Sequence, residues 1–169
     1  MGMTLEQFSA ECHRLLKADP GPAGREKVCK LVSEMCKDEA FVAANLGDDV
    51  PDRKVLYEDP ELGFCILGHV HKEFPGRPSQ PHDHGPAWAI YGQAKGETVM
   101  TDYFPVARPT EDQPGKARPV RDYKLVCGDA YLYNEGDLHS PRREMPTRLI
   151  RIEGRNMDKV RRFPYERVA

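Results

Sequence analysis

The chain has 169 residues, 39% of them hydrophobic, which is enough to bury one core but would be crowded for two full domains. Acidic and basic residues are mixed throughout and leave a formal charge of −2. No basic stripe or polybasic tail favours nucleic acid or an anionic membrane, so we expect small molecules as partners.

The beginning of the chain and its cysteines indicate a location. The N-terminus lacks the apolar core of a signal peptide, and no apolar run approaches the roughly 20 residues that a bilayer crossing needs. The five cysteines show no C-x-x-C spacing, and a chain of this length does not need disulfides. We expect a reduced, cytoplasmic protein that is a monomer or a homodimer.

Residues 1–50 are expected to form an N-terminal helical cap. Thr4 and Gln7 make a capping-box pattern, and apolar residues then recur at helical spacing to about Lys17. The Asp19-Pro20-Gly21-Pro22 stretch ends this first helix.

Two further helices are expected after this break. Apolar positions from Val28 to Cys36 follow the i, i+3, i+4, i+7 pattern of an amphipathic helix. Asp38 is a candidate N-cap for a short third helix, and Gly47 is well placed just after its end.

Residues 51–169 are expected to form an all-β barrel, because short β-prone runs alternate there with turn clusters. Two stretches, Pro75-Gly76-Arg77-Pro78 and Pro105 to Pro119, contain too much proline for central strands and are expected to be surface loops. The predicted strands are Val55 to Tyr57, Phe64 to Val70, His82 to Tyr91, Glu97 to Tyr103, Val120 to Cys127, Ala130 to Asn134 and Arg148 to Glu153.

Three histidines form the most specific pattern. His82 and His84 are separated by one residue, and His139 follows 55 residues later. An H-x-H pair on a strand puts both imidazoles on one face, since side chains alternate with period two, and the two can then share one ion. With His139 from a distant strand, the sequence predicts a half-open metal site.

His69 and His71 form a second H-x-H pair. By spacing alone this pair is an alternative metal site, but it lacks the flanking proline and glycine of the first. We expect a role beside the metal ligands or in the core.

The three imidazoles would carry no charge, so a divalent ion would keep close to its full charge and attract an anionic, chelating substrate. With iron(II), oxygen could bind beside that substrate, whereas zinc would lower the pKa of a bound water to about 7. Nitrogen ligands argue against magnesium and calcium. Zinc, nickel and manganese remain open beside iron.

The stretch Pro81-His82-Asp83-His84-Gly85, the turn glycine Gly96 and the segment from Gly128 to His139 resemble the two metal-binding motifs of the cupin superfamily. A helical cap followed by H-D-H and a late histidine resembles the cysteine dioxygenase type of thiol dioxygenases. The resemblance spans roughly residues 53–154. It implies a double-stranded β-helix and an oxidoreductase in which Fe(II), held by three histidines, uses O2 on a small anionic substrate with a thiol or carboxylate.

The chain departs from that family at two places. Ala89 stands where most cupins place a glutamate ligand and where animal cysteine dioxygenases place a crosslinking cysteine. The stretch Leu149 to Glu153 lacks the Ser-x-His-x-Tyr triad of that family. We therefore expect free cysteine to be a poor substrate.

Two other functions remain open. The chain could be a zinc, nickel or manganese cupin that acts as a hydrolase, lyase or isomerase, or a non-catalytic ligand-binding cupin. A cavity plugged by large apolar side chains such as Trp88 and Met100 would favour the last.

Further candidate site residues surround the metal ligands. Tyr91 is two residues after Ala89 and would lie on the same face of a strand. Its phenol could therefore line the cavity and hydrogen-bond a substrate or an oxygen species. Trp88 is expected at the barrel mouth, where it could contact substrate. Arg53 resembles the arginine that grips the substrate carboxylate in thiol dioxygenases.

Arg151 and Glu153 have two opposite interpretations. Strand alternation alone would turn Ile150 and Ile152 inward and both charged side chains to water. The family resemblance would turn residues 151 and 153 inward, where Arg151 could bind a substrate carboxylate and Glu153 could act as a base. Arg142 and Arg143 are expected to be loop residues near the cavity rim.

Overall fold

The computed structural model describes residues 2–74, 76 and 79–169, and its first part is helical. The helices are α1 (Leu5–Ala18), α2 (Pro22–Cys36) and α3 (Glu39–Asn45). Thr4 and Gln7 form the predicted capping box, and Asp38 caps α3 by accepting a hydrogen bond from the backbone N–H of Phe41 at 3.1 Å. Local signals therefore located these helices correctly.

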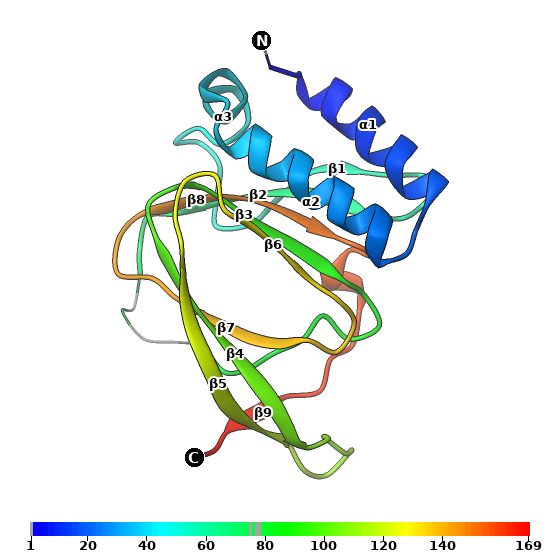
Figure 1. Cartoon of the computed structure of the whole chain (residues 1–169). Helices are drawn as coiled ribbons and strands as arrows, with labels where there is room; N and C mark the ends of the chain where they lie inside the picture. Colours follow the sequence, from blue (N-terminus) through cyan, green and yellow to red (C-terminus); the bar gives the residue numbers. More distant parts are fainter. Residues whose placement is uncertain (1, 75, 77–78) are drawn as a thin grey trace.

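Two sheets follow, and Figure 1 shows the helices on the outer face of one of them. The five-stranded sheet has the order β1-β2-β8-β3-β6, and the four-stranded sheet has the order β7-β4-β5-β9. The strands in the described part of the chain are β1 (Lys54–Glu58), β2 (Cys65–His71), β3 (Ala89–Lys95), β4 (Thr98–Ala107), β5 (Gly115–Leu125), β6 (Ala130–Tyr133), β7 (Leu138–Arg142), β8 (Thr147–Glu153) and β9 (Tyr165–Arg167).

The sheets curl toward each other and fit a β-barrel (Figure 1). From β3 to β8 the chain passes repeatedly between the two sheets, so strands distant in sequence become neighbours. The helices make the description "all-β" only approximate. Gly92 on β3 shows how closely they pack, because a Cβ atom there would lie 2.4 Å from Val32 of α2.

The helical layer explains how β8 is oriented. Ile150 and Ile152 are fully buried in the core that the helices form with the five-stranded sheet. The prediction from strand alternation, which turned the isoleucines into the barrel and the charges to water, is therefore wrong. Both faces of this sheet are covered, and Arg151 and Glu153 line a cavity on the face away from the helices.

The proline-rich stretch 105–119 was expected to be a loop, but strands β4 and β5 run through most of it. Pro105 pairs with Ala117 and Pro119 with Tyr103, next to two shifts in the β4–β5 register. Such bulges tolerate residues that lack a backbone N–H. The predicted loop at Pro75-Gly76-Arg77-Pro78 falls mostly outside the described residues, which include only its glycine.

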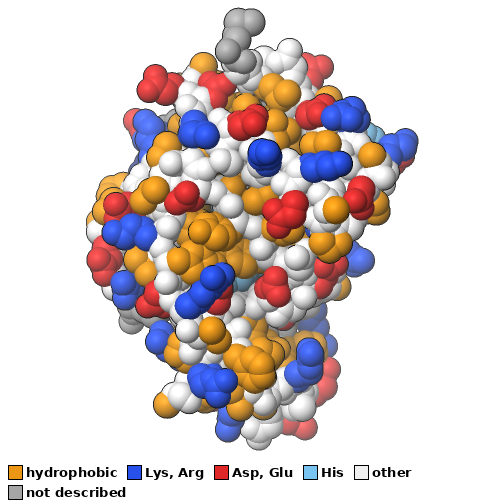
Figure 2. Space-filling model, in the orientation of Figure 1, with side chains coloured by type: hydrophobic (Ala, Val, Ile, Leu, Met, Phe, Trp, Pro, Cys, Tyr) orange, Lys and Arg blue, Asp and Glu red, His pale blue; other side chains and the backbone are white. Residues whose placement is uncertain are grey.

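The surface agrees with the mixed charge of the sequence. On the face that Figure 2 shows, Lys and Arg side chains are interspersed with Asp and Glu. None of the helices in the described part of the chain has the length and apolar character that a membrane crossing requires.

Candidate metal centre and its cavity

His82 and His139 are brought together by their backbones. The N–H of each residue donates to the carbonyl oxygen of the other at 3.0 Å. The two residues thus form an isolated antiparallel bridge, in which His82 belongs to none of the named strands. The predicted strand from His82 to Tyr91 is therefore wrong in its first half, because β3 begins only at Ala89. The predicted strands also omitted β7, which carries His139.

A tight turn, and not strand alternation, positions His84. The Asp83 carboxylate accepts a hydrogen bond from the Gly85 N–H at 2.9 Å, and Gly85 has a φ of +57°, a conformation that glycine adopts at low cost. The Ala87 N–H donates to the His84 carbonyl oxygen at 3.0 Å. The motif thus delivers its second histidine through an Asp-Gly turn.

The three predicted ligands converge in the structure. One ligand nitrogen of each of His82, His84 and His139 lies within 4.8 Å of the other two, and the Nε2 atoms of His84 and His139 are 3.3 Å apart. The Tyr91 Oη atom lies 3.1 Å from Nε2 of His84, 3.2 Å from that of His139 and 3.4 Å from that of His82. Four potential donor atoms therefore share one small space.

The contacts among these four atoms outnumber the hydrogens available to make them hydrogen bonds. The Nδ1 atoms of His82 and His139 lie 3.2 Å and 3.3 Å from the carbonyl oxygens of Gln80 and Asp137. A carbonyl oxygen only accepts, so in each neutral ring Nδ1 carries the hydrogen and Nε2 presents a lone pair. The four contacts at 3.1–3.4 Å then have at most two hydrogens between them, one from Tyr91 and one from His84.

A cation fits this arrangement. It would replace the lone-pair contacts with bonds, and nitrogen donors suit zinc, iron, nickel or manganese better than magnesium or calcium. Burial lowers the pKa of His82 to about 4 and that of His84 to about 2, and it lowers the pKa of His139 far below its usual range. The imidazoles therefore stay neutral near pH 7, as metal ligands must be.

A cavity of about 440 Å³ opens beside the ligands, a volume suited to a small molecule. Four arginines and two carboxylates line it among the described residues, an excess of two positive charges before a metal binds. Its lining comprises Arg53, His69, His71, Ser79, His82, His84, Tyr91, Pro141, Arg143, Arg151, Glu153, Met157, Asp158 and Arg162.

Arg53 reaches this cavity, but its donors are already used. Two of its N–H groups donate to the carboxylate oxygens of Glu153, both at 2.9 Å, and a third donates to Asp158 at 3.1 Å. The Glu153 carboxylate raises the pKa of Arg53. Glu153 is fully buried and also accepts from the Met157 N–H. The geometry therefore favours neither Arg53 as the carboxylate-binding arginine nor Glu153 as a free base.

Arg151 and Arg143 have unused donors. The Nε atom of Arg151 and the Nε and Nη2 atoms of Arg143 are buried and have no hydrogen-bond partner among the described residues. Burial lowers the pKa of Arg143 to about 10, and the nearby Arg151 charge adds to this effect. Arg143 was expected to be a loop residue at the rim. The signal that would have placed it is its spacing of four from His139, which puts residues 139, 141 and 143 on one side of an extended chain.

The second H-x-H pair lines the same cavity. His69 Nδ1 lies 2.6 Å from the carbonyl oxygen of Asp52, so its hydrogen is on Nδ1. The rings of His69 and His71 stack with centroids 5.8 Å apart, and both Nε2 atoms are buried without a partner. These imidazoles line the cavity beside the arginines.

Trp88 and Met100 do not plug the cavity. Trp88 packs in the core between the helices and the five-stranded sheet, with the Arg25 guanidinium 5.2 Å from its ring centroid. Its predicted place against substrate is therefore wrong. Met100 is fully buried in a separate small cluster with Leu125 and Tyr133.

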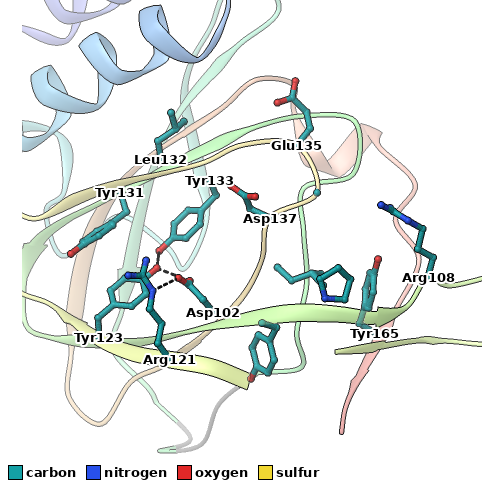
Figure 3. Close-up of a pocket in the computed structure, with 14 residues that line it drawn as sticks. Asp102, Arg108, Arg121, Tyr123, Tyr131, Leu132, Tyr133, Glu135, Asp137 and Tyr165 are labelled. Atoms are coloured by element: carbon teal, nitrogen blue, oxygen red, sulfur yellow. Dashed lines mark hydrogen bonds and ion pairs between the residues drawn. The ribbon is translucent and has the colours of Figure 1, made fainter. Parts of the chain in front are cut away.

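A second cavity, of about 530 Å³, is lined by Tyr133 (Figure 3). The Tyr133 ring packs on that of His139, with centroids 4.1 Å apart. Its hydroxyl lies 2.5 Å from that of Tyr123, which donates to Asp102 at 2.8 Å. This chain of hydrogen bonds holds the ring that supports His139.

Among known proteins, the chain is similar to solved structures in its fold, and not to a known sequence family. No known family profile matches the chain, and no curated protein matches it. Structural matches include KdgF from Halomonas sp. (18% identity, TM-score 0.47, covering 67% of this chain and 90% of that one) and the Cnp3 cupin domain of Schizosaccharomyces pombe (8%, 0.48, 68% and 68%). A cupin-2 domain protein from Shewanella frigidimarina also matches (12%, 0.44, 70% and 95%).

Several of the neighbouring solved structures are described as cupin proteins or domains, and another is described as having a double-stranded β-helix domain. None of the three named above is described as a thiol dioxygenase. What the site does is therefore argued from the geometry of this chain.

Proposed function

We propose that this protein is a metal-dependent enzyme of the cupin type that acts on a small anionic molecule, and that it is an iron(II)-dependent dioxygenase. One observation carries the proposal. Three neutral imidazoles converge beside a cavity lined by two arginines whose buried N–H groups have no partner in the described part of the chain.

The cavity favours an anion for two reasons. A divalent ion on three neutral ligands keeps its charge and attracts a negative group. Arg143 and Arg151 have buried donors that a carboxylate or a similar oxyanion would satisfy, and leaving such donors unpaired costs about 1–3 kcal/mol each. Both features favour a substrate that binds the metal through one group and the arginines through another.

Iron(II) at this centre would supply O2 activation next to the bound substrate. The residues of the chain then have separate tasks. Arg143 and Arg151 hold the anion, and Tyr91 presents its phenol at the reacting end. The Arg53–Glu153 pair balances charge in the cavity wall. An open cavity beside the ligands is what an enzyme needs and a purely structural metal site does not.

The test is metal analysis followed by oxygen uptake. Protein purified without added metal is analysed for iron, zinc, nickel and manganese, then loaded anaerobically with Fe(II). Mercapto-, hydroxy- and aminocarboxylates, with free cysteine among them, are added in turn. We expect one metal per chain and oxygen consumption with a carboxylate other than cysteine.

Other outcomes contradict the proposal. Zinc at one equivalent, with no oxygen uptake after iron loading, would point to the non-oxidative alternative. Cysteine as the best substrate would contradict the weight given to the missing triad and crosslink.

A further inference from the structure

We propose that Tyr91 is a fourth protein ligand of the metal, through its phenol oxygen. Tyr91 lies on β3 and is 1% exposed, and its Oη atom is 3.1–3.4 Å from the Nε2 atoms of all three histidines. The inference rests on the proposed metal site but not on the proposed reaction.

The distances match a tetrahedral site. Metal bonds of about 2.0–2.1 Å put neighbouring donors about 3.3–3.4 Å apart in a tetrahedron. Four of the six donor–donor separations are 3.1, 3.2, 3.3 and 3.4 Å. The other two join His82 to His84 and His139, whose ligand atoms lie within 4.8 Å of it. The Tyr91 oxygen thus occupies the fourth vertex of a tetrahedron whose other three vertices are the histidine nitrogens.

Hydrogen bonds alone do not explain this position. The Tyr91 hydroxyl has one hydrogen and therefore donates to one Nε2 atom, whereas three lie at nearly equal distance. Two of these, on His82 and His139, present lone pairs. A cation bonded to all four atoms satisfies every lone pair at once, and the phenol proton leaves to solvent when the ion binds.

The surroundings of Tyr91 suit a ligand. The guanidinium carbon of Arg151 lies 4.1 Å from the ring centroid, so a positive charge stands beside a group that becomes negative on coordination. The Tyr133 ring packs against it edge-on with centroids 5.2 Å apart. Both contacts hold the ring with its oxygen toward the histidines.

The role has a consequence for substrate binding. Four protein donors close a tetrahedral site, as in structural zinc centres, while catalytic centres keep a position open. A substrate must then add to the coordination sphere or displace the phenol oxygen. An anion bound to Arg151 would lie close to the ring that must move.

The test compares the parent with Tyr91→Phe and Tyr57→Phe. The Tyr57 hydroxyl donates to Asp59 at 3.0 Å, and its ring packs against the helical core, so its loss leaves the four donors intact and controls for removal of a tyrosine hydroxyl. Each protein is loaded with Fe(III), and visible absorption is recorded, because a phenolate bound to Fe(III) gives a strong charge-transfer band. Zinc affinity is measured by chelator competition.

We expect the band in the parent and in Tyr57→Phe, its loss in Tyr91→Phe, and zinc affinity at least about tenfold weaker in Tyr91→Phe alone. X-ray absorption of the zinc-loaded parent should show four nitrogen or oxygen neighbours, together with the outer-shell scattering of three imidazole rings. An unchanged band and affinity in Tyr91→Phe would overturn the inference and leave the three-histidine site standing. A parent that binds no metal would overturn both the inference and the proposed function.

Discussion

The pairs His82–His84 and His69–His71 have the same spacing and line the same cavity, yet they differ in what surrounds them. Among the described residues, only the first pair has a third nitrogen donor within reach, from His139. After burial, the Arg151 charge lowers the pKa of His69, and the Arg143 and Arg151 charges lower that of His71. The Arg151 charge also lowers the pKa values of His82, His84 and His139, so positive charge does not distinguish the two pairs, whereas the third donor does.

The comparison shows a requirement that the H-x-H spacing does not express. Two imidazoles close together supply ligands, but a third donor is needed to hold a cation. The second pair has buried Nε2 atoms with no partner among the described residues, which suits acceptance of a hydrogen bond from a substrate.

The largest expected effect is loss of the third donor. His139→Ala should abolish stoichiometric metal binding at micromolar metal, since only two imidazoles remain beside a phenol that must lose its proton before it can bind the ion. His69→Ala should bind as the parent does. Equilibrium dialysis with zinc measures both, and circular dichroism should show that both proteins are folded, because barrel burial supplies most of the stability. A full equivalent of tightly held metal in His139→Ala would break the distinction between the pairs.

The next effect concerns the charges near the second pair. Glu153→Gln removes the buried carboxylate that accepts two hydrogen bonds from Arg53, which leaves the partly buried guanidinium with Asp158 as its acidic partner. The free energy of unfolding should fall by about 1.5–3 kcal/mol in denaturant titrations. Glu144→Gln is the control, because its exposed pair with Arg142 should contribute less than about 1 kcal/mol. Equal losses in the two variants would contradict the role given to Glu153.

A smaller effect is expected for anion recognition. Arg143→Lys and Arg151→Lys keep the charge but lose the planar fork, so affinity for a carboxylate ligand should fall about 10- to 100-fold while metal content stays constant. Arg142→Lys, at the neighbouring residue, is the control. Calorimetric titration of the metal-loaded proteins gives the affinities. Arg142 lies outside the cavity lining, so an equal loss of affinity in its variant would show that the loss does not come from the arginine donors in the cavity.

The smallest effect is a dependence of stability on pH. Burial, followed by the charge of Arg143, lowers the pKa of His71 to about 4. As pH falls from about 6.5 to about 4, unfolded chains bind a proton at this residue and the folded metal-free protein does not. Stability should therefore fall by at most about 1.4 kcal/mol per pH unit through this residue. His71→Gln should show a shallower slope, and an identical slope in the variant would remove His71 from the account.

Much of this site was visible in the sequence, because ligand identity depends on short patterns. The histidine motifs gave the three converging residues, and capping signals such as Thr4 with Gln7 located the helices. These features depend on neighbours a few residues apart. They do not require knowledge of how the sheets pack.

What the sequence did not predict depends on packing between layers. Alternation in β8 could not reveal which face the helices would cover, so the sequence left open whether Arg151 and Glu153 face water or the cavity. The ion pair between Arg53 and Glu153 joins residues that are 100 positions apart in the chain. Tyr91 was expected in the cavity, but its equal distance from three nitrogens appears only in three dimensions.

The most direct test of the central claim is a metal count by native mass spectrometry on two double variants. The parent and the His69→Ala/His71→Ala protein should each carry one divalent ion per chain, and the His82→Ala/His84→Ala protein should carry none. Retention of the ion after loss of His82 and His84, or its loss after removal of His69 and His71, would contradict the assignment of the metal centre.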